Sequence, residues 1–289
     1  ENIFKEIDKQ DFESSYLKEL KEGLNKDGGS LKAIKELKKI GSYIDLRQNF
    51  VANIILNAIV LWDFYCIDMF DKWKKSYGKN IRTYLEIVGE IEALISLASI
   101  TYVRDDYTFA KVNECDDLKP EIDFKNLKHP LIKIEDAVGN GITLKGQTCV
   151  ITGSNMSGKT TFLRSIGINL VLSYAGGPAL ASEFKTSVMK VLTSIRVEDN
   201  VNKGISTFYA ELLRIKDMTE YNKNKMPMIC LIDEIFKGTN SADRIICATE
   251  AIKKLSQPWS ITLVSTHDFE LCNLENDDNI NAVNYHFAE

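Results

Sequence analysis

The residues best suited to chemistry lie in the segment 153–160, where two glycines, a lysine and a threonine have the spacing G-x-x-x-x-G-K-T. An apolar run, 149–152, precedes this segment, and a stretch with helical pattern, 161–171, follows it. In that context glycines let the backbone wrap around phosphate groups, and the N–H groups at the start of the helix point at them. The pattern predicts a P-loop, with a glycine-rich structural turn as the alternative. The predicted nucleotide-binding residues are Gly153, Ser154, Asn155, Met156, Ser157, Gly158, Lys159, Thr160 and Thr161.

Two side chains of this segment would have chemical roles of their own. Lys159 would neutralise charge on the β- and γ-phosphates, which makes it a candidate catalytic residue, and the Thr160 hydroxyl would bind Mg²⁺. No Asn-Lys-x-Asp segment, with which GTPases recognise guanine, occurs in the sequence. We therefore expect ATP and Mg²⁺ at this site.

Adjacent carboxylates, Asp233 and Glu234, follow a second apolar run, 228–232. A buried strand ending there would place both at the carboxyl edge of a sheet, beside the P-loop. Asp233 suits a partner of bound Mg²⁺, so Thr160 and Asp233 are the predicted metal residues. Glu234 suits a general base that orients and polarises the attacking water. The alternative for such a pair alone is a strand end followed by a helix cap.

A histidine, His267, follows a third apolar run, 261–265. A lone histidine is more often a structural residue. At the end of a strand beside the P-loop, however, it could hydrogen bond the γ-phosphate. The two preceding motifs favour this interpretation, and His267 is our third candidate catalytic residue.

The composition indicates a soluble globular protein. Hydrophobic residues make up 44% and charged residues 27% of 289 residues, and the net charge is −5 with neither half basic. A protein that holds DNA by broad phosphate neutralisation would show a basic face, so any contact with DNA must be local or lie elsewhere in a longer chain. Six cysteines without a C-x-x-C pair, and three histidines, favour reduced thiols over a zinc site. These features predict a cytoplasmic protein.

The most apolar stretch, 50–62, contains Asn53 and Asn57 and is followed by Asp63. It is too short and too interrupted to span a bilayer, so we expect a core helix. No signal peptide is recognisable. The first residue is glutamate rather than methionine, which indicates a piece of a longer protein.

Two regions differ in their hydrophobic pattern. Residues 12–104 have helical spacing, with a break at 28–30 and two long helices expected over 46–75 and 81–103. Beyond about residue 126, short apolar runs alternate with helical stretches, which predicts an α/β fold with a mainly parallel sheet covered on both faces. The expected strands are 148–152, 188–195, 228–232 and 261–265.

Together the three motifs resemble the ATPase domain of the MutS family, over about residues 85–289. The most specific segments are the P-loop at 151–161, with Asn155 and Met156 inside it, a signature-like segment at 204–211, and the acidic motif with its following loop at 231–244. Weaker similarities lie at 89–94 and 129–130. The resemblance implies an ABC-type P-loop ATPase domain over 126–289, preceded by an all-α, core- or lever-like region over 1–125.

The resemblance also implies a mechanism in which two subunits share composite ATP sites as a homodimer. Ser206 and Thr207 of the opposite subunit would reach the γ-phosphate, and Asn240 and Ser241 would carry the state of one site to the other. ATP would close the dimer and hydrolysis would loosen it. For the segment 206–208 alone, a helix N-cap is an alternative role compatible with this one.

The sequence departs from the family pattern at several positions. Ser154 and Ser157 replace a proline and a glycine, which the loop tolerates because backbone amides bind the phosphates there. Val138 lies where an aromatic residue often stacks on adenine, so the adenine contact stays open. We also find no mismatch-reading domain with its Phe-x-Glu wedge in this chain, and the chain stops near where the family usually continues into a helical dimerisation element.

Three functions remain in view. The leading one is a MutS-like ATPase whose nucleotide-driven dimer is coupled, in the full-length protein, to mismatched or branched DNA. The second is an ABC-like ATPase coupled to a protein or membrane partner without reading DNA, so membrane association of the full-length protein stays open. The third is a nucleotide-binding scaffold without hydrolysis, against which Glu234 argues.

Overall fold

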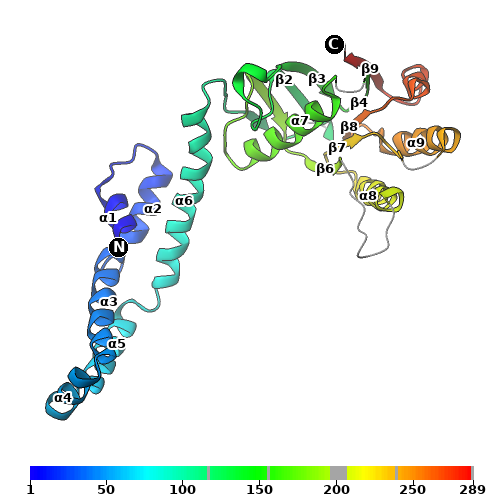
Figure 1. Ribbon diagram of the computed structural model, residues 1–289. Helices are drawn as coiled ribbons and strands as arrows, with labels where there is room; N and C mark the ends of the chain where they lie inside the picture. The colour runs from blue at the N-terminus through cyan, green and yellow to red at the C-terminus, as the bar shows by residue number, and fades with distance from the viewer. Residues whose placement is uncertain (116–117, 155–156, 196–206, 238–239, 288–289) are drawn as a thin grey trace. The chain divides into compact units, whose positions relative to one another are not determined.

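The computed structural model describes residues 1–115, 118–154, 157–195, 207–237 and 240–287 (Figure 1). The chain forms two compact units, Glu1–Ser96 and Leu97–Glu289. We predicted the division at 125/126, about 30 residues later. The difference arises because a strand at 121–127 pairs within the second unit, so a division at 125/126 would cut it.

The first unit is helical, as its sequence pattern predicts. Its helices are α1 Asn2–Lys9, α2 Ser15–Asn25, α3 Ser30–Asp45, the 3₁₀ turn η1 Leu46–Gln48, α4 Phe50–Val60, α5 Trp62–Tyr77 and α6 Ile81–Val103, which continues into the second unit. Apolar residues one turn apart bury a common core that includes Leu24, Ala33, Trp73 and Tyr84. The Trp73 indole Nε1 donates to the Ala33 carbonyl at 2.8 Å, which satisfies the polar atom of this buried ring.

The prediction of a single helix over 46–75 is wrong. The chain breaks at Leu61, whose φ of 52° is left-handed, and α4 and α5 meet at 79°. Asn57 explains the break: its Nδ2 donates to Asn53 Oδ1 at 2.7 Å, and its Oδ1 accepts from the backbone N–H of Asp63 at 2.9 Å. The asparagines therefore stabilise a helix start inside an apolar run.

The expectation of a core helix at 50–62 is also wrong, since Phe50 is 77% and Ile59 is 76% exposed. Among the described residues no single helix meets the length and hydropathy that a bilayer crossing requires, although the bent pair Asn53–Val60 and Trp62–Tyr77 meets them jointly.

The second unit is built on a five-stranded, all-parallel sheet. Its strands, in spatial order, are β6 Lys190–Ser194, β7 Met228–Asp233, β8 Ser260–Ser265, β4 Thr148–Gly153 and β9 Ala282–Phe287. The four strands expected from apolar runs are confirmed, and β9 is an addition. Three of them, β4, β7 and β8, are almost wholly buried, as expected of parallel strands covered on both faces.

Helices cover both faces of this sheet. Helix α7, Lys159–Tyr174, packs with Cys149 and Ile151 of β4 on one face. On the other face, Val150 packs in a second core with α8 Thr207–Asn222, α9 Ser241–Leu255 and the 3₁₀ segment η5 Phe269–Asn276. Successive residues of β4 thus enter opposite cores, which follows from the period of two in a strand.

A second sheet, which the sequence did not predict, has the order β1-β5-β2-β3. Its strands are β1 Lys111–Asn113, β5 Glu183–Ser187, β2 Glu121–Leu127 and β3 Asn140–Lys145, and a 3₁₀ turn, η3 Ile134–Asp136, lies between β2 and β3. β2 runs antiparallel to both neighbours. Phe124 of β2 stacks on Phe184 of β5 at 5.8 Å and contacts Phe162 of α7, so this sheet shares the core of α7.

The fold brings three strand ends to one edge. β8 lies between β7 and β4, with Ser265 opposite both Asp233 and Ile151. The chain leaves β4 into α7 on one face and leaves β8 into η5 on the other. In open α/β sheets, ligands bind outside the carboxyl ends of strands at such a point.

Candidate active site

The two glycines of the predicted P-loop have backbone geometry that favours glycine. Gly153 has φ 149° and Gly158 has φ 95°, both outside the range that L-residues usually adopt. A Cβ on Gly153 would lie 2.7 Å from the Phe287 carbonyl oxygen and 2.9 Å from Ser157 Oγ. Ser157 Oγ in turn donates to the Ser154 carbonyl at 3.0 Å. The described residues of the loop, 153–154 and 157–158, are therefore closely packed before α7 begins.

Lys159 lies on the inner side of this loop. Its Nζ donates to the carbonyl oxygens of Gly153 at 2.8 Å and Ser154 at 2.6 Å, and the residue is only 6% exposed. Burial lowers the pKa of the lysine, although nearby Glu234 and Asp233 act in the opposite direction. A buried cation at a helix start is suited to bind a phosphate anion.

Asp233, at the end of β7, contacts both the start of α7 and the end of β8. Its Oδ2 accepts from Thr160 Oγ1 at 2.9 Å, and its Oδ1 accepts from the Ser265 hydroxyl. The predicted metal pair, Thr160 and Asp233, is thus in direct contact. A hydroxyl beside a carboxylate is an all-oxygen donor set, which fits Mg²⁺. Thr161, the remaining loop residue, lies in α7, where its carbonyl accepts from Ser165 Oγ.

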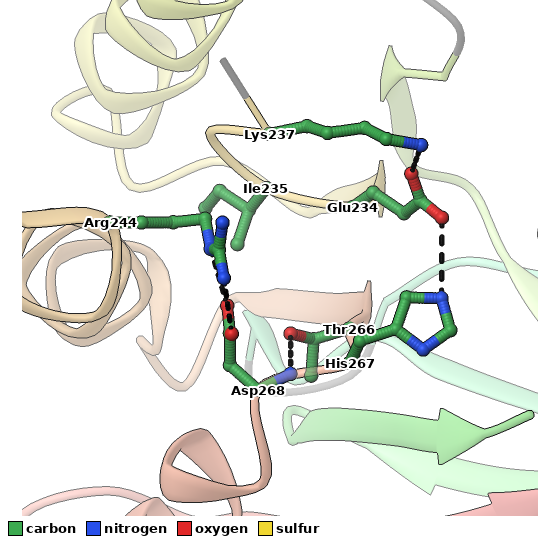
Figure 2. A pocket seen from close by; sticks show the side chains of 7 residues that line it. All are labelled: Glu234, Ile235, Lys237, Arg244, Thr266, His267 and Asp268. Atoms are coloured by element: carbon green, nitrogen blue, oxygen red, sulfur yellow. Dashed lines mark hydrogen bonds and ion pairs between the residues drawn. The ribbon is translucent and has the colours of Figure 1, made fainter. Parts of the chain in front are cut away.

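Glu234 leaves the end of β7 with φ 49°, a left-handed conformation that is rare for glutamate. Its backbone N–H donates to the Ser265 carbonyl at 3.0 Å. Its carboxylate pairs with Lys237, and its Oε1 lies 3.4 Å from His267 Nε2 (Figure 2). Burial raises the pKa of Glu234, but hydrogen bonds and charges from Lys237 and His267 outweigh burial and lower it below its ordinary value.

Glu234 and His267 line one cavity of about 230 Å³, together with Ile235, Lys237, Arg244, Thr266 and Asp268 (Figure 2). The side chain of His267 is 41% exposed, so a ligand in the cavity could reach it. The structure thus brings together the predicted Glu234 and His267, which lie 33 residues apart in sequence.

Three of the predicted residues lie outside the described part of the chain, and for a fourth only its place in a helix is described. Asn155, Met156 and Ser206 fall outside the described residues, and Thr207 is the first residue of α8. Ser241 begins α9, and Asn240 is its N-cap. Asn240 Oδ1 accepts from the Asp243 backbone N–H at 3.1 Å, so this exposed asparagine has a structural role within its own chain.

Sequence reasoning assigned no role to Glu211, although it lies at the end of the signature-like segment. Burial raises the pKa of Glu211, while the backbone N–H groups of Phe236 and Lys237 hydrogen bond to its carboxylate and lower it. Phe236 has φ 58°, and Glu211 therefore supports the left-handed turn that follows Glu234. Its Oε2 is buried without a hydrogen-bond partner in the described part of the chain.

Comparison with known proteins identifies the part of the chain that carries these residues. Residues 149–289 match the family MutS domain V. This part of the chain is a MutS domain V. It contains the predicted P-loop, Asp233, Glu234 and His267, and its first residue lies within β4. The site geometry described above thus belongs to domain V.

Individual relatives of domain V extend the similarity beyond the family match. The DNA mismatch repair protein MutS of Thermus caldophilus is 30% identical over 200 residues, which cover 67% of this chain and 23% of that protein. The MutS of Protochlamydia amoebophila is 30% identical over 224 residues, 74% of this chain and 25% of that protein. The DNA mismatch repair protein MSH3 of Vanderwaltozyma polyspora is 34% identical over 166 residues, 54% of this chain and 15% of that protein. The chain thus spans a quarter or less of the length of these relatives.

Proposed function

We propose that domain V binds ATP with Mg²⁺ and hydrolyses it as an ABC-type P-loop ATPase. One observation carries this proposal: the ends of β4, β7 and β8 bring Lys159, the Thr160–Asp233 pair and Glu234 to one edge of a parallel sheet. Phosphoryl transfer needs little covalent chemistry from the protein, so a charged and well-oriented set of side chains is what an ATPase requires.

Each residue of this set has a role in the proposal. The loop amides at 153–161 and the Lys159 ammonium bind the phosphates. To do so, Lys159 gives up its hydrogen bonds to the Gly153 and Ser154 carbonyls and donates to phosphate oxygens instead. Thr160 and Asp233 hold Mg²⁺, which neutralises phosphate charge when bound. Because its pKa is lowered, Glu234 is ionised at neutral pH and can orient and polarise the attacking water. His267, which lines the same cavity as Glu234, hydrogen bonds the γ-phosphate.

At the level of the whole protein, we propose a cytoplasmic homodimer in which ATP binding and hydrolysis are coupled to recognition or repair of mismatched or branched DNA. The names of the relatives support this proposal, since all three are DNA mismatch repair proteins. They do not favour the alternative, an ABC-like ATPase coupled to a protein or membrane partner. In the dimer, Ser206 and Thr207 act on the partner's ATP, and Asn240 and Ser241 lie at the interface.

Nucleotide binding by the variant Lys159→Ala tests the proposal. We expect ATP affinity to fall at least about tenfold, because a charge-assisted contact to phosphate contributes roughly 1.5–3 kcal/mol. The matched control is Lys223→Ala, which removes an exposed lysine directly after α8 that pairs with Glu220 and should leave affinity unchanged. Equal ATP affinity in both variants would contradict the P-loop assignment.

A further inference from the structure

An ion pair joins α9 to the start of η5, the segments that follow β7 and β8. Arg244, in the first turns of α9, donates from Nε to Asp268 Oδ2 at 2.7 Å and from Nη2 to Asp268 Oδ1 at 2.6 Å (Figure 2). The side chains are 24% and 14% exposed, so water screens this pair less than an exposed pair. Two parallel N–H···O bonds fix the orientation of both planar groups, which a single contact would not do.

The segment around His267 is held on both sides. The preceding residue, Thr266, is buried, and its backbone N–H donates to the Ile151 carbonyl of β4 at 3.0 Å. Thr266 Oγ1 then accepts from the Asp268 backbone N–H at 3.0 Å. On the far side of His267, the Asp268 carboxylate is held by Arg244. The backbone that carries the imidazole is therefore fixed by β4 at one end and by α9 at the other.

The carboxylate of Asp268 does not cap the 3₁₀ segment that follows it. Asp268 is the N-cap residue of η5, where an aspartate commonly accepts a backbone N–H of the following turn. Its side chain makes no such bond, and both oxygens accept from Arg244 instead. The carboxylate thus contributes to the link with α9 rather than to the start of η5.

Arg244 also lies next to the residue proposed to contact the second subunit. Its backbone N–H donates to the Asn240 carbonyl at 3.0 Å, the hydrogen bond that closes the first turn of α9. This hydrogen bond and the ion pair therefore form a continuous path from Asn240 to Asp268, the residue after His267.

We propose that Arg244 is a positioning residue that acts through Asp268 to set the place of His267 beside Glu234, and so couples the first turn of α9 to the γ-phosphate side of the site. The inference deepens the proposed ATPase function and rests on it for the role of His267. The link from Arg244 to His267 can be tested without nucleotide, independently of the ATPase function.

A measurement without nucleotide tests the link itself. The chain has three histidines, His129, His267 and His286, so their imidazole signals can be resolved by NMR and assigned through His267→Ala. We expect Arg244→Gln and Asp268→Asn to shift the His267 signal and to leave those of His129 and His286 in place. The matched control is Lys253→Gln, which breaks an exposed pair between the other end of α9 and Asp277, beyond η5. An unmoved His267 signal in both site variants would overturn the proposal.

Steady-state ATP turnover tests whether the link from Arg244 to His267 matters for catalysis. We expect Arg244→Gln to lower kcat roughly ten- to a hundredfold with little change in KM, because small misplacements of positioned groups have effects of that size. In a His267→Ala background the same substitution should have almost no further effect, since both changes act on one path. Equal losses of kcat in both backgrounds would show a merely structural pair. If the unaltered protein showed no turnover while the NMR shift occurred, the proposed ATPase function would fail and the positioning link would stand.

Discussion

At the scale of single residues, the polar groups of the site satisfy one another in the structure. The Lys159 ammonium donates to loop carbonyls, Thr160 donates to Asp233, and Glu234 pairs with Lys237. Such pairing is required because an unpartnered buried charge is costly. Binding of a nucleotide would replace the loop carbonyls that Lys159 contacts with phosphate oxygens.

The same principle applies to Arg104, which is 6% exposed at the end of α6. It forms an ion pair with Asp106 and donates to the Ile132 carbonyl at 2.8 Å, while Lys128 reaches Asp106 at 3.0 Å. The hydrogen bond from Arg104, with help from Lys128, lowers the pKa of Asp106 from 3.8 to about 2 against the effect of burial.

We predict that Asp106→Asn lowers the free energy of unfolding by about 2 kcal/mol at pH 7, the value that corresponds to this change in pKa. Since the folded-state pKa is depressed, the stabilisation is complete above about pH 4 and is lost as the pH falls toward 2. Denaturant unfolding of the variant and of the unaltered protein at pH 7 and at pH 2 measures the difference in their free energies of unfolding.

The matched control for Asp106 is Glu183→Gln, which breaks the exposed pair with Lys125 and should change stability by less than about 1 kcal/mol. An Asp106→Asn penalty that persisted at pH 2 would contradict the assignment of the stabilisation to the ionised carboxylate.

At the scale of elements, the sequence predicts best where a strand is buried on both faces. β4, β7 and β8 are continuous apolar runs, so their location and their parallel arrangement follow from the pattern. The strands β2 and β3 alternate apolar residues with charged or polar ones such as Asp123, a weaker signal than a continuous apolar run, and β1 has only three residues, so the sequence did not predict them. The break between α4 and α5 depends on the side-chain contacts of Asn57, which hydrophobic periodicity does not contain.

The same reasoning explains which site residues the sequence predicts. Lys159, Asp233 and His267 each follow an apolar run, and parallel strands place their ends at one edge, so their meeting follows from local motifs. Glu211 and the partners Arg244 and Asp268 act through contacts between elements distant in sequence. Their roles required the positions of α8, α9 and η5.

The N-cap of α9 allows a prediction at this scale. Asn240→Ala removes the acceptor for the Asp243 N–H and should lower the free energy of unfolding by about 1 kcal/mol. Asn240→Ser, which keeps a cap oxygen, should retain stability. If Asn240 also acts across the subunit interface, ATP turnover should fall in both variants, because serine lacks the amide. Unfolding and turnover of the two variants separate these roles, and normal turnover in Asn240→Ser would argue against an interface role.

At the scale of the whole molecule, domain V occupies the second of two units, and the chain spans only a fraction of the length of its relatives. The net charge of the chain is −5, so no overall positive charge attracts DNA to it. The proposed coupling to DNA therefore depends on nucleotide state being passed from domain V to other parts of a longer protein. The proposed nucleotide chemistry of domain V can be measured on this chain by itself.

The most direct test of that chemistry compares ATP binding and phosphate release in the unaltered protein and in Glu234→Gln. The substitution keeps the shape of the side chain and removes the base. The account predicts ATP affinity within about threefold of the unaltered protein and phosphate release slower by roughly 100-fold or more, the usual contribution of a general base. Phosphate release at the unaltered rate would contradict the assignment of Glu234 as the base and, with it, the proposed mechanism of hydrolysis.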